Sequence, residues 1–458
     1  MPKRLALSTI ALITTSLASF LTAFTGSSIN IALPTIGHEL SIHAVRLSWI
    51  TFAYILSANV FLLPMGRLAD IWGRARIFTL GTLVFAMASL ACALSSGAFM
   101  LIGFRILQGL GGAMLFGTGV AILSDAFPAE ERGRVLGINV AAVYIGLSLG
   151  PPLSGLITAS LGWRNIFVLS AGVGLVVFWL AFRKLEARKI PAAGGRFDLG
   201  GACLWGSALT ATVYGFSLLP TVLGLVLVFM GLILFSVFLR GEGRKENPLL
   251  DLALFRKNRA FAFSNLAALI NYSSTHGVGF LFSLYLQYLK GFTPETAGLI
   301  MISQPMVMAV CSPFAGRLSD RTEPRIVASI GMALTVTGLV IALFLRRDSS
   351  FLHVIAALVT LGLGFAFFSS PNTNAIMSTV EKKSYGVASA LVATMRLSGQ
   401  TLSMTIVTLV FATIIGRHEI TPEFYPAFLR SLRIILAIFS ALCLAGVFAS
   451  MIRGKIRS

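Results

Sequence analysis

The string GRLADIWGRA at residues 66–75 returns 250 positions later as GRLSDRTEPR at residues 316–325. Each copy follows a long apolar run of the kind that recurs from one end of the chain to the other. Such runs, of roughly 18 to 25 residues, are long enough to cross about 30 Å of hydrocarbon as a helix. The sequence therefore predicts an internally duplicated membrane protein.

The composition agrees, because 56% hydrophobic and 12% charged residues cannot surround a water-soluble core of 458 residues. The predicted fold is an all-α polytopic membrane protein, since the runs lack the period-two alternation of a membrane-spanning β-barrel. Fourteen spans are expected. They lie near residues 8–32, 47–67, 77–97, 98–124, 134–158, 165–182, 199–217, 220–239, 260–284, 296–316, 326–345, 351–377, 385–415 and 431–452.

A net charge of +19 raises the possibility of nucleic-acid binding. However, most of the 36 Lys and Arg residues fall on one side of the predicted spans, as the positive-inside rule requires. We therefore expect no nucleic-acid partner, a location in the cell membrane, and both termini in the cytoplasm. The opening apolar run is too long for a signal peptide and is interpreted as an uncleaved first helix. The 4 cysteines are far apart and imply neither a disulfide nor a metal site.

Aligning the two repeated strings divides the chain into three parts. Residues 1–183 form a first bundle of six helices, and residues 260–458 form a second with a short basic tail. Residues 184–259 hold two basic linkers and two inserted helices. Because both repeated strings must face the same side, the insertion has to cross the membrane an even number of times, which a pair of helices does.

Four groups of motifs carry a resemblance to a known family. They are Gly66, Asp70, Gly73, Arg74 and Arg76 in the repeated string; Arg105, Gln108 and Gly109 in helix four; Gly146, Gly150, Pro151 and Gly155 in helix five; and the strings NPLLDLALFRKNRAF at 247–261 and YLQYLKGFTPETAGL at 285–299. On these residues the chain resembles the major facilitator superfamily, and most closely its fourteen-helix drug/proton antiporter group. The resemblance covers nearly the whole chain and implies a monomeric transporter that works by alternating access. The helix-five motif is similar to one that marks exporters.

The repeated string also has a physical interpretation. Gly66 and Gly73 permit a tight turn between helices, and Asp70 and Arg74 can reach a helix terminus or an opposite charge. Asp125 is the nearest candidate partner for Arg74. The resemblance implies a latch that holds the cytoplasmic side closed, whereas the alternative is a solvated basic loop. The latch candidates are Gly66, Asp70, Gly73, Arg74, Arg76 and Asp125, with Gly316, Asp320 and Arg321 in the second copy.

Helix five is a candidate hinge. Its small residues let a neighbouring helix approach closely, and Pro151 and Pro152 remove backbone donors. The functional interpretation is that Gly146, Gly150, Pro151 and Gly155 bias the protein toward export; the alternative is ordinary helix packing.

The centre of the membrane holds no predicted acid, since all 17 Asp and Glu lie at or beyond the span ends. In the drug/proton antiporters, helix one usually carries an aspartate five residues before the Asn of its NxALP string. Here that position is Thr25, and the Asn is Asn30. Either another group couples protons or the protein is not proton-coupled. His276, with a reference pKa of about 6.5, is the remaining candidate carrier at depth.

Two cations do lie at depth, Arg105 and Arg396. A buried cation needs polar partners, and Gln108 and Gln400 share a helical face with them. Superposing the repeats places Arg396 opposite Tyr144. The arginines either tie helices together or line the substrate path. The cavity or coupling candidates are Thr25, Asn30, Arg105, Gln108, Tyr144, Asn271, His276, Gln304, Asn372, Asn374 and Arg396.

These features predict a secondary transporter that exports apolar or amphipathic, drug-like compounds and is driven by protons. An exporter or facilitator of an anionic metabolite or lipid is the first alternative, and a non-transporting receptor or scaffold is the second. No enzyme motif appears in a suitable context, so an enzyme is not expected. The expected partners are a small-molecule substrate, protons and the lipid bilayer, and no cofactor or metal is predicted.

Overall fold

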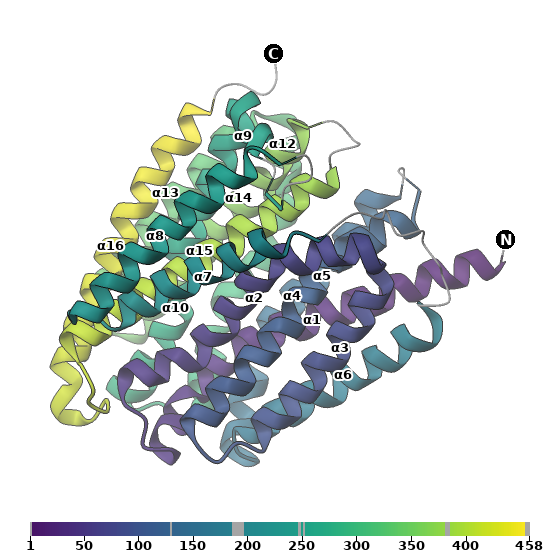
Figure 1. Ribbon diagram of the computed structural model, residues 1–458. Coiled ribbons are helices and arrows are strands. Elements are labelled where there is room, and N and C mark those ends of the chain that lie inside the picture. Colours follow the sequence, from purple (N-terminus) through teal and green to yellow (C-terminus); the bar gives the residue numbers. More distant parts are fainter. Residues whose placement is uncertain are drawn as a thin grey trace.

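Long helices form almost all of the computed structural model (Figure 1). The structure describes residues 2–128, 131–185, 197–245, 249–250, 252–380 and 385–453. Within these ranges no β-strand occurs. The all-α prediction is therefore confirmed.

The first bundle contains six helices, each built from one predicted apolar run. α1 packs against α5, α2 packs against α4, and α3 packs against both α4 and α6. Their bounds are α1 Pro2–Glu39, α2 Ala44–Trp72, α3 Arg74–Ala93, α4 Ala98–Ala126, α5 Arg132–Ser160 and α6 Arg164–Lys184.

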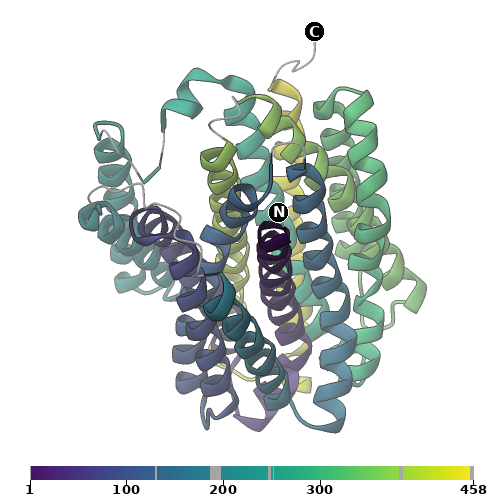
Figure 2. The ribbon, with the colours of Figure 1, turned by 90° about the vertical axis from the view of Figure 1, so that its right-hand side faces the viewer.

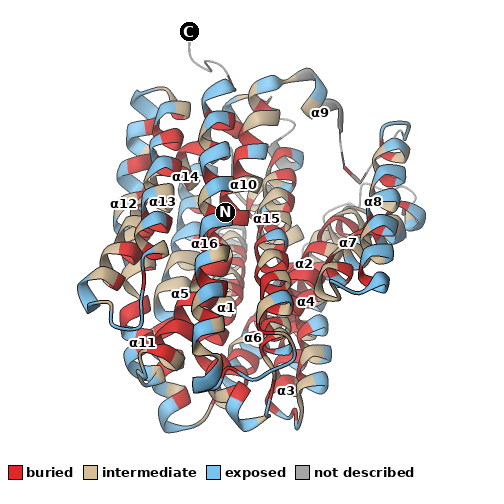
Figure 3. Ribbon diagram, turned by 90° about the vertical axis from the view of Figure 1, so that its left-hand side faces the viewer, coloured by how far each residue is buried: buried red, intermediate tan, exposed pale blue. Residues whose placement is uncertain are grey.

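The inserted pair consists of α7 (Leu199–Ser217) and α8 (Val222–Glu242), which pack against each other. α7 also contacts α2 and α15. In Figure 3 the pair lies at the margin of the molecule opposite α12 and α13, and α8 is largely exposed. Asp198 caps α7, since its Oδ1 accepts a hydrogen bond of 3.0 Å from the Gly201 amide. An acid is favourable at this helix terminus, because it accepts from a free amide and complements the helix dipole.

The second bundle begins after a six-residue helix, α9, inside the second predicted linker. α10 continues into a π-helical turn, η1, and α10 packs against α15 and α16. α13 packs against α14 and α16. The bounds are α9 Leu252–Lys257, α10 Arg259–Leu284, η1 Tyr285–Leu289, α11 Pro294–Met301, α12 Ser303–Arg321, α13 Pro324–Leu343, α14 Phe351–Ser378, α15 Tyr385–Ile414, η3 Pro422–Phe424 and α16 Tyr425–Ile452.

The span predicted at residues 296–316 is confirmed as the segment Pro294–Arg321, although its helix breaks for one residue at Ile302, between α11 and α12. Pro305 lacks the amide that would bond to the carbonyl of Met301, which accounts for the break. Twelve of the described helical segments are long and apolar enough to cross a membrane, counting α11 and α12 together. α7 and α10 occupy the two other predicted spans. Two six-helix bundles and an inserted pair are thus the observed fold.

Some sequence predictions lie outside the described residues. Residues 186–196 of the first linker are among them, as are Asn247, Pro248 and Asp251 in the motif at 247–261. The domain limits of 1–183, 184–259 and 260–458 therefore stay a prediction.

The two bundles meet at the end of the helices where α1 finishes. Ser283 of α10 donates to the carbonyl oxygen of Asn30 over 2.5 Å, and Gln287 donates to that of Ile31 over 3.0 Å. Nearby, the amide of Ala44 donates to the carbonyl of His418 over 3.0 Å. Figure 2 shows α1 running through the middle of the molecule, with helices of the second bundle beside it.

Candidate functional site

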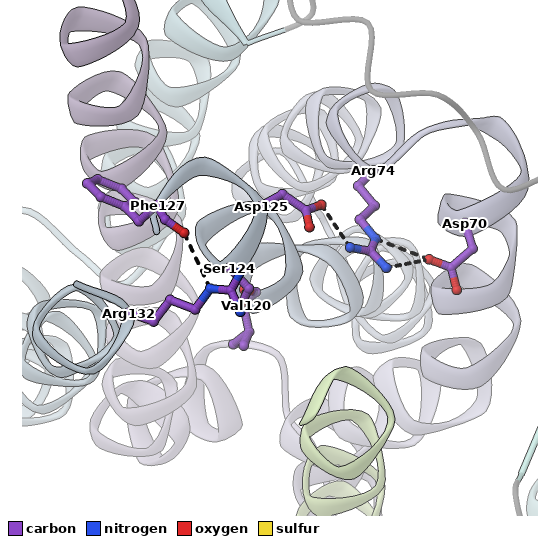
Figure 4. Close-up of polar contacts among 7 residues, drawn as sticks. All are labelled: Asp70, Arg74, Val120, Ser124, Asp125, Phe127 and Arg132. Atoms are coloured by element: carbon purple, nitrogen blue, oxygen red, sulfur yellow. Dashed lines mark hydrogen bonds and ion pairs between the residues drawn. The ribbon is translucent and has the colours of Figure 1, made fainter. Parts of the chain in front are cut away.

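The charged residues of the repeated string join three helices of the first bundle (Figure 4). Arg74, at the start of α3, donates to Asp70 of α2 over 3.0 and 3.1 Å and to Asp125 of α4 over 2.8 Å. The three side chains are about one-third exposed. The predicted contact between Arg74 and Asp125 is confirmed. Because all three residues belong to the first bundle, their action as a latch between the bundles stays a prediction.

The two glycines of the string have different tasks. Gly73 is the single residue between α2 and α3, and its φ of 104° is a conformation that favours glycine. Gly66 does not shape this turn, so that prediction is wrong. It lies inside α2, where a Cβ atom on Gly117 of α4 would stand 3.4 Å from its Cα. Gly66 therefore serves the close approach of two helices. Arg76 is exposed on α3.

In the second copy of the string, an asparagine side chain from another helix donates hydrogen bonds to the string. Asn374 of α14 donates to Asp320 over 2.9 Å and to Ser319 over 3.1 Å, both on α12. Gly316 packs on Ser370, and Arg321 is exposed at the end of α12. The structure thus brings together Asp320 and Asn374, which the sequence had placed in separate groups.

The candidate hinge lies between two neighbouring helices. A Cβ atom on Gly146 or Gly150 would clash with α1, at the carbonyl of Phe20 and at Ser27 respectively. On the other side, a Cβ atom on Gly155 would clash with the carbonyl of Pro294 in α11. Pro151 is part of the same contact, because its carbonyl oxygen lies against Gly298 of α11. α5 therefore approaches a helix of each bundle backbone to backbone.

Arg105 is fully buried in the first bundle and has protein partners. Its Nε donates to the carbonyl of Ile50 over 3.0 Å, its Nη1 donates to Gln108, and its guanidinium lies 4.5 Å from the centre of the Tyr54 ring. Gln108 in turn donates to Ser89 over 2.7 Å. The predicted pairing with Gln108 is confirmed, and these contacts tie α4 to α2 and α3.

Arg396 of α15 has a different environment. Its side chain is partly exposed, and its guanidinium lies 5.6 Å from the centre of the Tyr272 ring of α10. Within the described part of the chain, no hydrogen bond or ion pair of Arg396 occurs. Its charge acts on Tyr144 of α5 and His276 of α10, so residues of both bundles surround it.

Tyr144 and His276 are both partly exposed in this region. The hydroxyl of Tyr144 accepts a hydrogen bond of 3.3 Å from Ser312 of α12, which bridges the two bundles. Gln304, near the start of α12, is also partly exposed.

Thr25 and Asn30 lie elsewhere. Thr25 is buried, and its hydroxyl is 3.1 Å from that of Ser170 of α6. The structure therefore does not place the helix-one position beside Arg396. Asn30 accepts a hydrogen bond of 3.3 Å from Thr51 of α2, next to the junction of the bundles.

The last candidate amides are Asn271 and Asn372, and Asn372 contacts Arg453, a residue that the sequence analysis did not select. Asn271 is fully buried, with neither polar side-chain atom bonded to any described residue. Asn372 of α14 donates to the carbonyl of Ser264 over 3.0 Å and accepts from Arg453 over 2.9 Å. Arg453 directly follows α16 and is 1% exposed. Its position in a basic tail suggested a solvated charge, so the sequence carried no signal for this contact.

Comparison with known proteins identifies the family to which this chain belongs. Residues 15–255 and 264–455 match the family described as Major Facilitator Superfamily. A similar protein is the riboflavin transporter RibZ of Clostridioides difficile (strain 630), which is 33% identical over 84% of each chain. The multidrug resistance protein Stp of Mycobacterium tuberculosis (strain CDC 1551 / Oshkosh) is 32% identical over 88% of this chain and 76% of its own.

Other relatives extend the pattern. The tetracenomycin C resistance and export protein of Streptomyces glaucescens is 28% identical over 88% of this chain and 76% of its own. The fold is also that of a bacterial homolog of the human lysosomal transporter Spinster, with a TM-score of 0.69, 16% identity and coverage of 98% of this chain and 97% of that one. The chain is a membrane transporter that belongs to the major facilitator superfamily.

Proposed function

We propose that this transporter is a secondary active exporter of amphipathic, drug-like compounds, of the fourteen-helix drug/proton antiporter type. The observation that carries the proposal is the packing of α5. Its glycines place it in backbone contact with α1 of its own bundle and with α11 of the other. A helix held this way can act as the pivot on which two bundles rock about a central site.

The relatives support export rather than uptake. Two of them are named as a multidrug resistance protein and as a tetracenomycin C resistance and export protein. A third is named as a riboflavin transporter. We infer from this range that the chain moves organic molecules out of the cell, that it lies in the cell membrane, and that its termini are cytoplasmic.

Proton coupling forms part of the proposal, and His276 is its candidate carrier. Thr25 of α1, whose hydroxyl is bonded to that of Ser170 of α6, occupies the position where the resemblance implies an acid. His276 of α10 is partly exposed and lies close enough to Arg396 of α15 to interact with its charge. On this proposal, His276→Gln abolishes proton-driven accumulation while downhill exchange of substrate continues.

The test is a transport assay in an efflux-deficient bacterial host. Expression of the wild type should raise tolerance to several amphipathic toxic compounds and lower their accumulation, and dissipation of the proton gradient should restore accumulation. Gly155→Leu should remove the effect, because its side chain cannot fit against Pro294. If wild-type expression changed the accumulation of no compound in a panel of neutral, cationic and anionic molecules, the proposal would fail and a non-transporting receptor would gain support.

A further inference from the structure

The two bundles differ in how they satisfy their intramembrane arginines, and Arg396 is the one whose guanidinium makes no hydrogen bond to any described residue. Arg105 is enclosed by Ile50, Gln108 and Tyr54. Among the residues that the structure describes, Arg396 has no hydrogen bond or ion pair, and its guanidinium lies over the ring of Tyr272. A cation at bilayer depth without an opposite charge is costly, and such residues mark substrate or ion pathways.

The surroundings of Arg396 are aromatic. Tyr272 lies beneath the guanidinium and makes an edge-to-face contact with Phe365 of α14, with ring centres 5.6 Å apart. Tyr144 approaches from the other bundle through its contact with Ser312. Arg396, Tyr144 and Phe365 are all partly exposed, so the group is accessible. A flat apolar ring fits against such side chains.

The backbone around this point is held firmly. Gly399, three residues after Arg396, lies so close to α10 that a Cβ atom would stand 2.7 Å from the Cβ atom of Tyr272. Asn59 of α2 accepts a hydrogen bond of 3.3 Å from Ser398 and donates one of 3.1 Å to Thr401. The cation therefore projects from a segment fixed to both bundles, as a preorganised binding residue requires.

We propose that Arg396, with Tyr272 and Phe365, binds the negative group of the substrate, and that the preferred substrates are amphipathic aromatic compounds with one carboxylate-type charge. This inference rests on the proposed export function and names its substrate class. A guanidinium donates two parallel hydrogen bonds to a carboxylate, which adds both affinity and orientation. The anion supplies the opposite charge that the chain lacks at this depth.

Binding to the full-length protein in lipid nanodiscs tests the inference. The probes are anthracene-9-carboxylate, 9-anthracenemethanol and 9-aminomethylanthracene, which share one ring system and differ in charge. The wild type should bind the carboxylate at least about tenfold more tightly than the alcohol, as expected for charge-assisted hydrogen bonds. Arg396→Gln should remove this preference, and Arg396→Lys should reduce it to about threefold, because a lysine keeps the charge without the planar fork.

Two variants serve as controls. Arg433→Gln replaces an exposed arginine of α16 and should leave all three affinities unchanged. Tyr272→Leu should weaken all three probes while the preference for the anion remains, since it removes the ring and keeps the charge.

A wild type that binds the three probes equally, or binds none of them, overturns the inference, as does a preference that survives Arg396→Gln. If Arg396→Gln does not assemble, an unchanged preference in Arg396→Lys overturns it instead. Flux of the same probes separates this result from the proposed function. Transport of all three without a charge preference leaves the exporter in place and removes the anion site, whereas anion binding without any flux does the reverse.

Discussion

Arg105 and Arg396 are the same residue type inside membrane-spanning helices of the two bundles, yet their environments are opposite. Arg105 is 0% exposed and is held by a backbone carbonyl, an amide and an aromatic ring. Arg396 is partly exposed and rests on a single ring. A membrane-embedded charge is therefore not by itself a binding site. Its partners decide whether it supports the fold or meets a ligand.

The clusters at the two copies of the repeated string differ in a similar way. The first bundle uses a cation between two acids, Arg74 with Asp70 and Asp125. The second uses Asn374 as a donor to Asp320. A charged cluster at the water interface changes its energy when a neighbouring helix moves, whereas an amide contact is less sensitive to its surroundings.

The largest expected effect is on the stability of the fold, which should depend on Arg105 far more than on Arg396. Arg105→Gln should lower the free energy of unfolding by about 3 kcal/mol, because two hydrogen bonds to a buried charged group are lost. Arg396→Gln should change it by less than about 1 kcal/mol. Thermal unfolding of both purified variants gives the answer as a shift in Tm. Equal losses would show that Arg396 is as structural as Arg105.

The next effect concerns the junction of the bundles. Gly155→Leu should reduce transport by more than about tenfold with normal membrane insertion, because the new side chain would meet the backbone of Pro294. Gly172→Leu is the matched control, since nothing lies within 4 Å of the position that its Cβ atom would occupy. Substrate efflux from preloaded cells measures both variants. Equal efflux would reduce α5 to an ordinary packing helix.

A smaller effect is expected on transport, and it should differ between the clusters at the two copies of the repeated string. Asp125→Asn should slow transport about fivefold, because loss of an interfacial ion pair worth up to about 1 kcal/mol shifts the balance between two conformations. Asp320→Asn should slow it less than about twofold, since the new amide oxygen can still accept from Asn374. Initial efflux rates at equal expression provide the comparison. The opposite ranking would assign the latch to the second bundle.

The smallest effect is expected at the inserted pair. Burial raises the pKa of Asp198, but hydrogen bonds from Lys245 and the Gly201 amide outweigh it and hold the pKa below its usual value. A lowered carboxylate pKa stabilises the fold above the unfolded pKa of about 3.9, and this contribution disappears as the pH falls through the folded value. Asp198→Asn should therefore cost less than about 1 kcal/mol at pH 7. In Tm measurements, a variant that lost as much stability at pH 3 as at pH 7 would contradict this.

The sequence was sufficient for the helices, because long apolar runs and the repeated string determine spans and symmetry. It also indicated that Arg74 pairs with Asp125 and Arg105 with Gln108. It could not show that Thr25 faces Ser170, since one-dimensional spacing does not say which neighbour a helix face meets. The burial of Arg453 could not be predicted for a related reason, because it results from the packing of α10, α14 and α16 around that side chain.

The contrast between the two arginines can be read in one experiment on the wild-type protein. Phenylglyoxal modifies accessible guanidinium groups, and peptide mass spectrometry of the protein in nanodiscs reports the modification of each arginine. We expect Arg396 to react, with anthracene-9-carboxylate protecting it, and Arg105 to stay unmodified. Modification of Arg105 at the rate of Arg396, or an Arg396 that the anion does not protect, would contradict the assignment of one arginine to the fold and the other to the substrate.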